Sequence, residues 1–287
     1  MKITNIHGLP QPLVNLFAKE TYTRGRADVS VTELIGSPRI SILKEKHHAE
    51  LTEDISDRFW AVMGTNIHRI LEQGADDDHL TEERLFLEVE GWMVSGGIDL
   101  QVSKAEGISI IDWKFVSTYS VKAPKEEWEK QLNCYAHLVR QAKRVPVQRL
   151  QVCAIVRDWL KSRAAQSPDY PQQPIQMIEI PLWEPERAEA FVLDRVRSHK
   201  EARRAEDWGE GLPHCSDQEK WLRGSAWAVT KKGGKRATKV CSSQEEAERY
   251  TLEVEGNWVI EMRPGEAVRC TNNYCGVADH CDQFKKV

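Results

Sequence analysis

The chain has 287 residues, of which 40% are hydrophobic and 29% are charged, a composition typical of a soluble globular protein with a sizeable core. The formal net charge is −4, so the bulk charge does not indicate a nucleic-acid partner, and any basic surface must be local. No run is apolar enough to span a bilayer and residues 1–7 lack the apolar segment of a signal peptide, so we expect a cytoplasmic protein with no membrane partner.

The first elements are predicted to be helices. Residues 1–29 mix proline, asparagine, arginine and glycine and are expected to form an N-terminal arm. Ser30-Val31-Thr32-Glu33 is a capping-box pattern, which predicts a short helix starting there. A second helix is expected over residues 39–48. Residues 56–73 carry apolar side chains at helical spacing and predict a longer helix that contains His68.

Strands follow. Residues 83–102 read as strand, residues 104–107 as a hairpin turn and residues 108–116 as the next strand. An antiparallel hairpin of this length would bring Asp99 close to Asp112.

The remaining elements complete the core and indicate a second region. Residues 128–143 and 185–205 predict helices, and residues 150–156 and 175–182 predict strands. The resulting order predicts a mixed α/β core over residues 30–206. Composition changes near Asp207, and a hairpin, a capped helix and a cysteine-bearing tail follow. We therefore assign residues 207–287 to a small C-terminal α+β module.

Several polar residues of the core share faces. Asp112 and Lys114 are two residues apart, so on a strand both point to one side. Gln131 and Tyr135 are four residues apart, so on a helix they also share a face. A metal-dependent phosphodiester cleavage site is one of the few roles that requires an aspartate and a lysine together beside an apolar strand.

Such a site would use one or two divalent cations to position a water, stabilise charge on the phosphorus and stabilise the leaving oxygen. Asp99, Asp112, His68 and the backbone carbonyl of Trp113 are donors that Mg²⁺ or Mn²⁺ accepts. Lys114 would place a cation where negative charge develops, and the following helix would orient it. A lone histidine is more often a partly buried polar residue, but beside two aspartates His68 becomes a candidate ligand.

Ordered motifs carry a family resemblance. Gly64-Thr65-x-x-His68, Gly96-x-x-Asp99, Asp112-x-Lys114 and Gln131-x-x-x-Tyr135 resemble the PD-(D/E)XK nuclease superfamily and, within it, the RecB-like exonuclease branch. That branch includes the nuclease domains of RecB and AddB and the CRISPR-associated RecB-like exonucleases. The resemblance covers about residues 30–157, and the wider run is similar to phage-encoded members.

The resemblance implies a restriction-endonuclease-like core, with a mixed central sheet flanked by helices. It implies that His68, Asp99 and Asp112 hold the metal and that Lys114 is catalytic, with Gln131 and Tyr135 completing the catalytic set. Glu83 lies where some members carry an additional acidic residue, and it reads equally well as a surface residue ahead of a strand.

The implied activity is a metal-dependent deoxyribonuclease. We expect an exonuclease acting at DNA ends or in single strands, in recombination, repair or replication of phage DNA in the host cytoplasm. A recombination or single-strand-annealing protein is an expected partner. Two alternatives stay open: a structure-specific endonuclease of the same fold, and a non-catalytic DNA-binding or recruiting protein.

The cysteines are a separate candidate site. Several RecB-like nucleases hold an iron–sulfur cluster with one cysteine before the core and three after it, but here no cysteine precedes Cys134. Ser37 stands in the region where the first ligand would be expected. Cys215 would instead join the tail residues Cys270, Cys275 and Cys281 around a 4Fe-4S cluster. Zn²⁺ is the alternative, with His214 or His280 replacing a thiolate, and free thiols are the third interpretation.

The densest basic run lies between two predicted strands of the C-terminal module. It contains Lys231, Lys232, Lys235 and Arg236. Such a run is often only a solvated hairpin tip. Beside an acidic metal site it would bind the phosphates of DNA.

Overall fold

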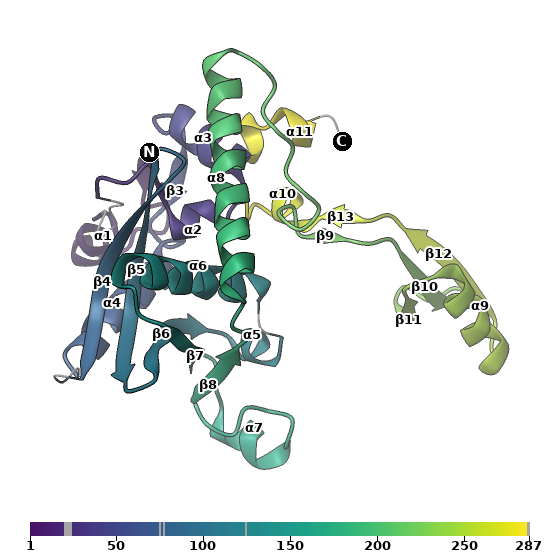
Figure 1. Cartoon of the computed structure of the whole chain (residues 1–287). Helices are drawn as coiled ribbons and strands as arrows, with labels where there is room; N and C mark the ends of the chain where they lie inside the picture. Colours follow the sequence, from purple (N-terminus) through teal and green to yellow (C-terminus); the bar gives the residue numbers. More distant parts are fainter. Residues whose placement is uncertain (20–24, 75, 77, 124, 286–287) are drawn as a thin grey trace. The chain divides into compact units, whose positions relative to one another are not determined.

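The computed structural model describes residues 1–19, 25–74, 76, 78–123 and 125–285. The chain forms two compact units (Figure 1). The first comprises Met1–Pro38 and His48–Gly211, and the second comprises Arg39–His47 and Leu212–Val287. No helix among the described residues is long and apolar enough to cross a membrane.

The first unit is built on a six-stranded mixed sheet. Its strands are β2 (Val29–Ser30), β4 (His79–Val89), β5 (Trp92–Lys104), β6 (Gly107–Val116), β7 (Val147–Val156) and β8 (Ile175–Ile180). They lie in the order β2-β5-β6-β7-β8, with β4 paired to β5. The β6–β7 pair is parallel, whereas β4–β5, β5–β6 and β7–β8 are antiparallel. This mixed sheet confirms the predicted fold class.

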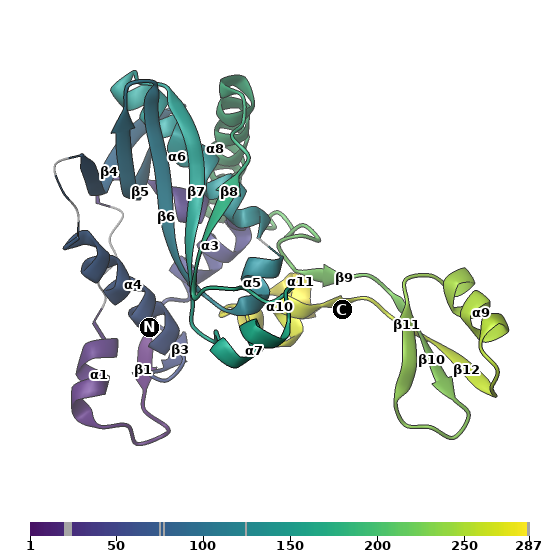
Figure 2. The same ribbon diagram turned by 90° about the horizontal axis from the view of Figure 1, so that it is seen from below.

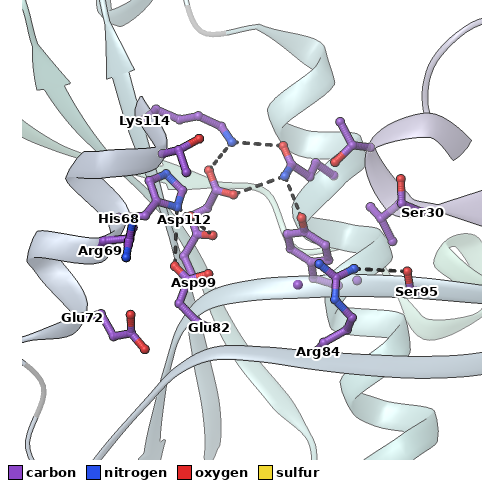
Figure 3. Close-up of a pocket in the computed structure, with 17 residues that line it drawn as sticks. Ser30, His68, Arg69, Glu72, Glu82, Arg84, Ser95, Asp99, Asp112 and Lys114 are labelled. Atoms are coloured by element: carbon purple, nitrogen blue, oxygen red, sulfur yellow. Dashed lines mark hydrogen bonds and ion pairs between the residues drawn. The ribbon is translucent and has the colours of Figure 1, made fainter. Parts of the chain in front are cut away.

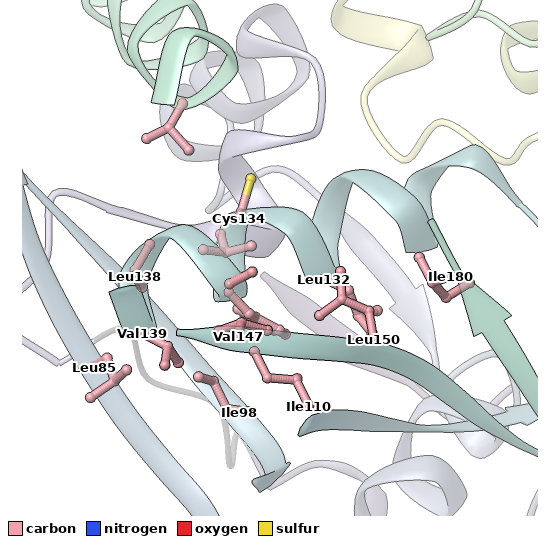
Figure 4. Packing of buried hydrophobic residues seen from close by; sticks show 14 of the residues in the cluster. Leu85, Ile98, Ile110, Leu132, Cys134, Leu138, Val139, Val147, Leu150 and Ile180 are labelled. Atoms are coloured by element: carbon pink, nitrogen blue, oxygen red, sulfur yellow. The ribbon is translucent and has the colours of Figure 1, made fainter. Parts of the chain in front are cut away.

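The first unit also contains helices, some of which pack on the sheet. They are α1 (Gln11–Phe17), α2 (Val31–Leu34), α4 (Phe59–Glu72), α5 (Thr118–Lys122), α6 (Glu126–Lys143), α7 (Lys161–Gln166) and α8 (Pro185–Asp207). Leu132 and Leu138 of α6 belong to the same buried cluster as Ile98, Ile110 and Leu150 of the strands (Figure 4). Burial of such side chains contributes about 1.5–3 kcal/mol each, which fixes α6 on the sheet. The architecture is consistent with a restriction-endonuclease-like core.

The prediction of one strand over residues 83–102 is wrong, because the chain turns in the middle of this range. β4 and β5 form a hairpin closed by Glu90 and Gly91, whose φ angles are 48° and 77°. Two consecutive positive φ values give a tight turn that matches the twist of the strands. The turn predicted at residues 104–107 is confirmed, as is the capping box of Ser30 and Glu33.

The N-terminal segment, predicted as an arm, is tied to the first unit. β1 (Lys2–Thr4) pairs in parallel with β3 (Thr52–Asp54), and these strands lie beside α1 and α4 (Figure 2). The Asp54 carboxylate accepts hydrogen bonds from the N–H groups of Ile6 at 2.8 Å and Ser56 at 3.0 Å. The bond from Ile6 is the largest of several that hold the pKa of Asp54 below its usual range. This stabilisation is present above a pH of about 4 and is lost as the pH falls through the lowered pKa.

The second unit joins a short helix from the N-terminal half to the C-terminal residues. Its elements are α3 (Pro38–Lys46, from Arg39 on), β9 (Leu222–Arg223), β10 (Ala226–Lys231), β11 (Ala237–Cys241), α9 (Gln244–Glu253), β12 (Trp258–Arg263), β13 (Glu266–Ala267), α10 (Val268–Thr271), a 3-10 turn (Ala278–His280) and α11 (Asp282–Lys285). β9 and β13 form a two-stranded stem, and β11-β10-β12 form a sheet that packs against α9.

The predicted boundaries at residues 29 and 206 differ from this division. Arg39 is 1% exposed, and its guanidinium donates hydrogen bonds to the carbonyls of Leu212 at 2.7 Å and Pro213 at 3.3 Å. It also pairs with Asp282. A buried guanidinium requires such partners, so residues 39–47 fold with the C-terminal part of the chain.

Candidate active site

The candidate site lies where strands β5 and β6 separate. Their ladder ends at the pair Leu100↔Ile111, and β5 continues to pair in parallel with β2. Asp99 and Asp112 are the next residues along the two strands. The Asp99 carboxylate accepts a hydrogen bond of 2.8 Å from the N–H of Trp113, which lies beyond the end of the ladder. The hairpin thus brings both aspartates to one place.

A cleft of about 500 Å³ opens at this point (Figure 3). Side chains from α4, β4, β5, β6 and α6 line it, together with residues at the start of α2. Every side chain predicted for the catalytic and metal sites lies in this lining: His68, Asp99, Asp112, Lys114, Gln131 and Tyr135.

Lys114 is held by two partners. Its Nζ lies 2.6 Å from Asp112 Oδ2 and donates a hydrogen bond of 3.1 Å to Gln131 Oε1. The Gln131 amide in turn donates to Asp112 Oδ1 at 3.3 Å and to the Tyr135 hydroxyl at 2.8 Å. A Cβ on Gly96 would lie 2.9 Å from the Tyr135 ring, so only glycine lets this ring pack against β5. The network fixes the position of the lysine.

Asp112 is buried, with an exposed fraction of 1%. Burial raises the pKa of Asp112 to about 6, against the opposing charge of Lys114, and the nearby Asp99 raises it further. Within the described part of the chain, Asp112 Oδ2 has the Lys114 ion pair but no hydrogen-bond donor in suitable geometry. A buried carboxylate requires a cationic partner such as Lys114, and a bound metal ion would supply a second one.

His68, Glu82 and Asp99 form a second cluster in the same cleft. The His68 Nδ1 atom lies 3.4 Å from Asp99 Oδ1 and 3.5 Å from Glu82 Oε1. Burial lowers the pKa of His68, but the hydrogen bonds to Asp99 and Glu82 outweigh it and raise the pKa to about 10. One ligand atom from each of the three residues lies within 4.8 Å of the others, which is close enough for one metal ion.

Glu82 is a residue of this site that the sequence did not identify. It lies between the ladder pairs Thr81↔Leu100 and Glu83↔Ile98, with a φ of 50°. Glu83, which the family pattern suggested, instead pairs with Lys143 at 2.5 Å. Successive residues of a strand point to opposite sides, so only one of two adjacent glutamates can enter the cleft.

The donor set fits a hard divalent cation. Glu82, Asp99 and Asp112 supply carboxylate oxygens, and His68 supplies an imidazole nitrogen, a combination that suits Mg²⁺ or Mn²⁺. Asp112 Oδ2 already pairs with Lys114 Nζ at 2.6 Å, and a carboxylate oxygen can accept a metal ion beside the ammonium. The Trp113 carbonyl remains a predicted ligand, and its N–H group bonds to Asp99.

A paired substitution separates the two adjacent glutamates. We expect Glu82→Gln to lower metal-dependent activity about 10- to 100-fold, because it weakens the ligand set or the orientation of His68. Glu83→Gln, which changes only contacts with Lys143 and Gln101 outside the cleft lining, should retain activity. The cleavage rates of the two variants are measured as a function of Mn²⁺ concentration and compared. Equal rates would show that Glu82 has no role at the metal.

The predicted cysteine ligands gather in the second unit. Cys215, Cys270, Cys275 and Cys281 line one cavity of about 250 Å³. Among the described residues, no three of their sulfurs lie within 4.8 Å of one another, whereas zinc at about 2.3 Å from each thiolate requires closer sulfurs.

Arg39 also contacts one of these cysteines. Its Nε donates to the Cys281 sulfur at 3.3 Å. Burial raises the pKa of Cys281, but the hydrogen bond and charge of Arg39, together with hydrogen bonds from the N–H groups of Phe284 and Gln283, lower the pKa overall. Cys134 and Cys153 are buried as core residues, in agreement with their interpretation from the sequence.

The basic run lies on an exposed hairpin of the second unit. Lys231 ends β10, and residues 232–236 connect it to β11. All the predicted phosphate-binding side chains are exposed: Lys231, Lys232, Lys235 and Arg236. Trp227 packs against the small core formed with α9. Trp221 is 40% exposed and lies beside Tyr274, with ring centroids 5.4 Å apart.

No protein-family model and no curated protein matches the chain. Solved structures that match the chain include that of a protein designated SSO0001, which is 17% identical in sequence. That match covers 64% of this chain and 83% of the other, with a TM-score of 0.45. A second, from Eubacterium rectale, bears the name "Putative exonuclease" and is 14% identical, covering 69% of this chain and 73% of the other, with a TM-score of 0.33. Likenesses at this level carry no functional conclusion.

Proposed function

We propose that the protein is a divalent-metal-dependent deoxyribonuclease of the PD-(D/E)XK superfamily, of the RecB-like branch and from a phage. The observation that carries the proposal is one cleft that holds the His68–Glu82–Asp99 group and the Asp112–Lys114 pair. Structural roles seldom require a buried aspartate, a held lysine and a three-residue ligand group in the same cleft.

Each residue of the cleft has a proposed role in hydrolysis. Glu82, Asp99, Asp112 and His68 would hold Mg²⁺ or Mn²⁺, which when bound supplies a Lewis acid for the phosphate and lowers the pKa of a water. Lys114 places a positive charge at the point where the attacking water or the phosphate gains negative charge. Gln131 keeps the Lys114 amine in place, and the Tyr135 hydroxyl fixes the rotation of the Gln131 amide.

We further propose that the enzyme acts as an exonuclease at DNA ends or in single strands. The test is a digestion of end-labelled linear DNA and covalently closed circular DNA with Mg²⁺ and with Mn²⁺. An exonuclease degrades the linear DNA and leaves the closed circle intact. Cleavage of the circle would identify an endonuclease, and metal-independent binding without cleavage would identify a DNA-binding protein.

The second unit is proposed to bind DNA through Lys231, Lys232, Lys235 and Arg236. Their exposure on one hairpin turn supports this, since lysine and arginine side chains there are accessible to phosphates.

For the cysteine cavity we propose a 4Fe-4S cluster held by Cys215, Cys270, Cys275 and Cys281. The cavity they share supports it, and the spacing of the sulfurs does not suit a single zinc ion. Visible absorbance and iron analysis of anaerobically purified protein test the proposal. Zinc in place of iron would overturn the cluster, and the absence of both metals would indicate free thiols.

A further inference from the structure

A group of aromatic side chains lies at the start of α4, apart from the catalytic network. Phe59 contacts Trp60, with ring centroids 4.8 Å apart, and Trp60 lies 6.0 Å from the ring of Phe115 on β6. The guanidinium of Arg157 stacks over the Trp60 indole at 4.2 Å. We call these four residues the aromatic platform.

Two rings of the platform are partly exposed to solvent. Trp60 is 50% exposed and Phe59 is 36% exposed, although both have aromatic neighbours that could cover them. None of the side chains of α4 is fully buried. The Trp60 indole is half exposed and has the Arg157 guanidinium stacked on it. An apolar ring surface and a positive charge are therefore available to a ligand.

The platform lies on the same helix as the metal group. Trp60, Gly64 and His68 are spaced four residues apart, so they follow one ridge of α4. A helix rises about 1.5 Å per residue, so the ridge covers about 12 Å between Trp60 and His68. A Cβ on Gly64 would meet no heavy atom within 4 Å, so this part of the ridge is open. Phe115 follows Lys114 on β6, so its side chain lies on the opposite face of the strand, where Trp60 of α4 meets it.

We infer that the aromatic platform binds unpaired nucleobases of a DNA single strand whose phosphate is in the cleft. The inference rests on the proposed nuclease function and specifies its substrate as single-stranded DNA or a single-stranded end. Aromatic rings stack on bases without regard to sequence, and arginine adds attraction to the neighbouring phosphates.

Charge and spacing support this occupant. The exposed side chain of Arg157 beside the indole suits a polyanion with flat apolar groups, which single-stranded DNA provides. At about 3.4 Å per nucleotide, the ridge spans roughly three to four nucleotides, and more extended strands need fewer. In a duplex the base faces are already stacked on one another, so the platform favours unpaired nucleotides.

The test measures DNA binding separately from cleavage. A fluorescein-labelled oligothymidylate and a duplex of equal length are titrated with the whole protein in Ca²⁺, and dissociation constants are obtained from anisotropy. Trp60→Ala is compared with Trp208→Ala, a control at the end of α8 where the indole is 75% exposed. Stacking of one base contributes about 1–3 kcal/mol, which corresponds to a loss of about 5- to 150-fold in single-strand affinity.

We expect Trp60→Ala to show this loss for the single strand and little change for the duplex, with Trp208→Ala unchanged for both. Gly64→Gln provides a second variant, because glutamine favours helix and its side chain would fill the open ridge. It should lower single-strand affinity without lowering the unfolding temperature. Equal single-strand affinities for Trp60→Ala and Trp208→Ala would overturn the proposed base-binding role of the platform. That result would not bear on the proposed nuclease function. Trp60-dependent binding without any cleavage would instead overturn the nuclease proposal alone.

Discussion

Asp112→Asn is expected to lower the rate of DNA cleavage by at least about 10³-fold, while the protein keeps its fold and stability. The substitution removes a charge that would bind the metal and that lies 2.6 Å from the catalytic candidate Lys114. The carboxylate is 1% exposed and its pKa is raised to about 6, so the native state bears a cost for holding it. Replacing it with a neutral side chain of equal size removes that cost.

The matched control is a second buried aspartate outside the cleft. Asp54 is 8% exposed and accepts hydrogen bonds from the Ile6 and Ser56 N–H groups. Asp54→Asn should lower the midpoint of urea unfolding, because the Ile6 and Ser56 N–H groups lose their charged acceptor, and leave the cleavage rate per folded molecule unchanged. Cleavage rates and urea unfolding of both variants provide the comparison. An Asp112→Asn protein that cleaves DNA at the wild-type rate would contradict the assigned site.

Arg39→Met is expected to destabilise the second unit by about 3 kcal/mol. The substitution leaves the carbonyls of Leu212 and Pro213 without their donor and removes the hydrogen bond to the sulfur of Cys281. The control is Arg149→Met, which breaks the pair with Glu179. Both side chains of that pair are more than half exposed, at 52% and 57%, so its loss should lower the stability far less than the loss of the Arg39 contacts.

Two measurements follow the Arg39 substitution. Urea unfolding gives the free energy, and the rate of Cys281 modification by a thiol reagent reports opening of the second unit, because this cysteine is 8% exposed. We expect faster modification in Arg39→Met than in Arg149→Met. Equal rates and equal unfolding midpoints would show that the buried guanidinium does not hold the C-terminal segment.

The sequence predicted those parts of the site that follow from local periodicity. A hairpin with a short turn necessarily brings Asp99 near Asp112, and spacings of two and four residues place Lys114 and Gln131 on defined faces. The capping box of Ser30 likewise depends only on neighbouring residues. In each case the spacing of neighbouring residues determines which side chains share a face, so distant contacts do not alter the prediction.

Other features depend on backbone irregularities and distant contacts. A positive φ at Glu82, which selects this residue over Glu83, has no signature in residue type. The turn at Glu90 and Gly91 interrupts an otherwise continuous run of strand-forming residues, and only the glycine hints at it. The contact between Arg39 and Cys281 joins residues far apart in the chain, so no periodic pattern could indicate it.

We propose that the cleft around Lys114 cleaves DNA with a divalent metal, and two lysines allow a direct test. Lys114 and Lys143 provide a matched pair, since both lysine side chains are 22% exposed and each pairs with a carboxylate, Asp112 and Glu83 respectively. The decisive measurement is the rate at which wild-type, Lys114→Ala and Lys143→Ala proteins degrade end-labelled linear DNA in Mn²⁺. We expect loss of cleavage in Lys114→Ala alone. A Lys114→Ala protein as active as Lys143→Ala would contradict it.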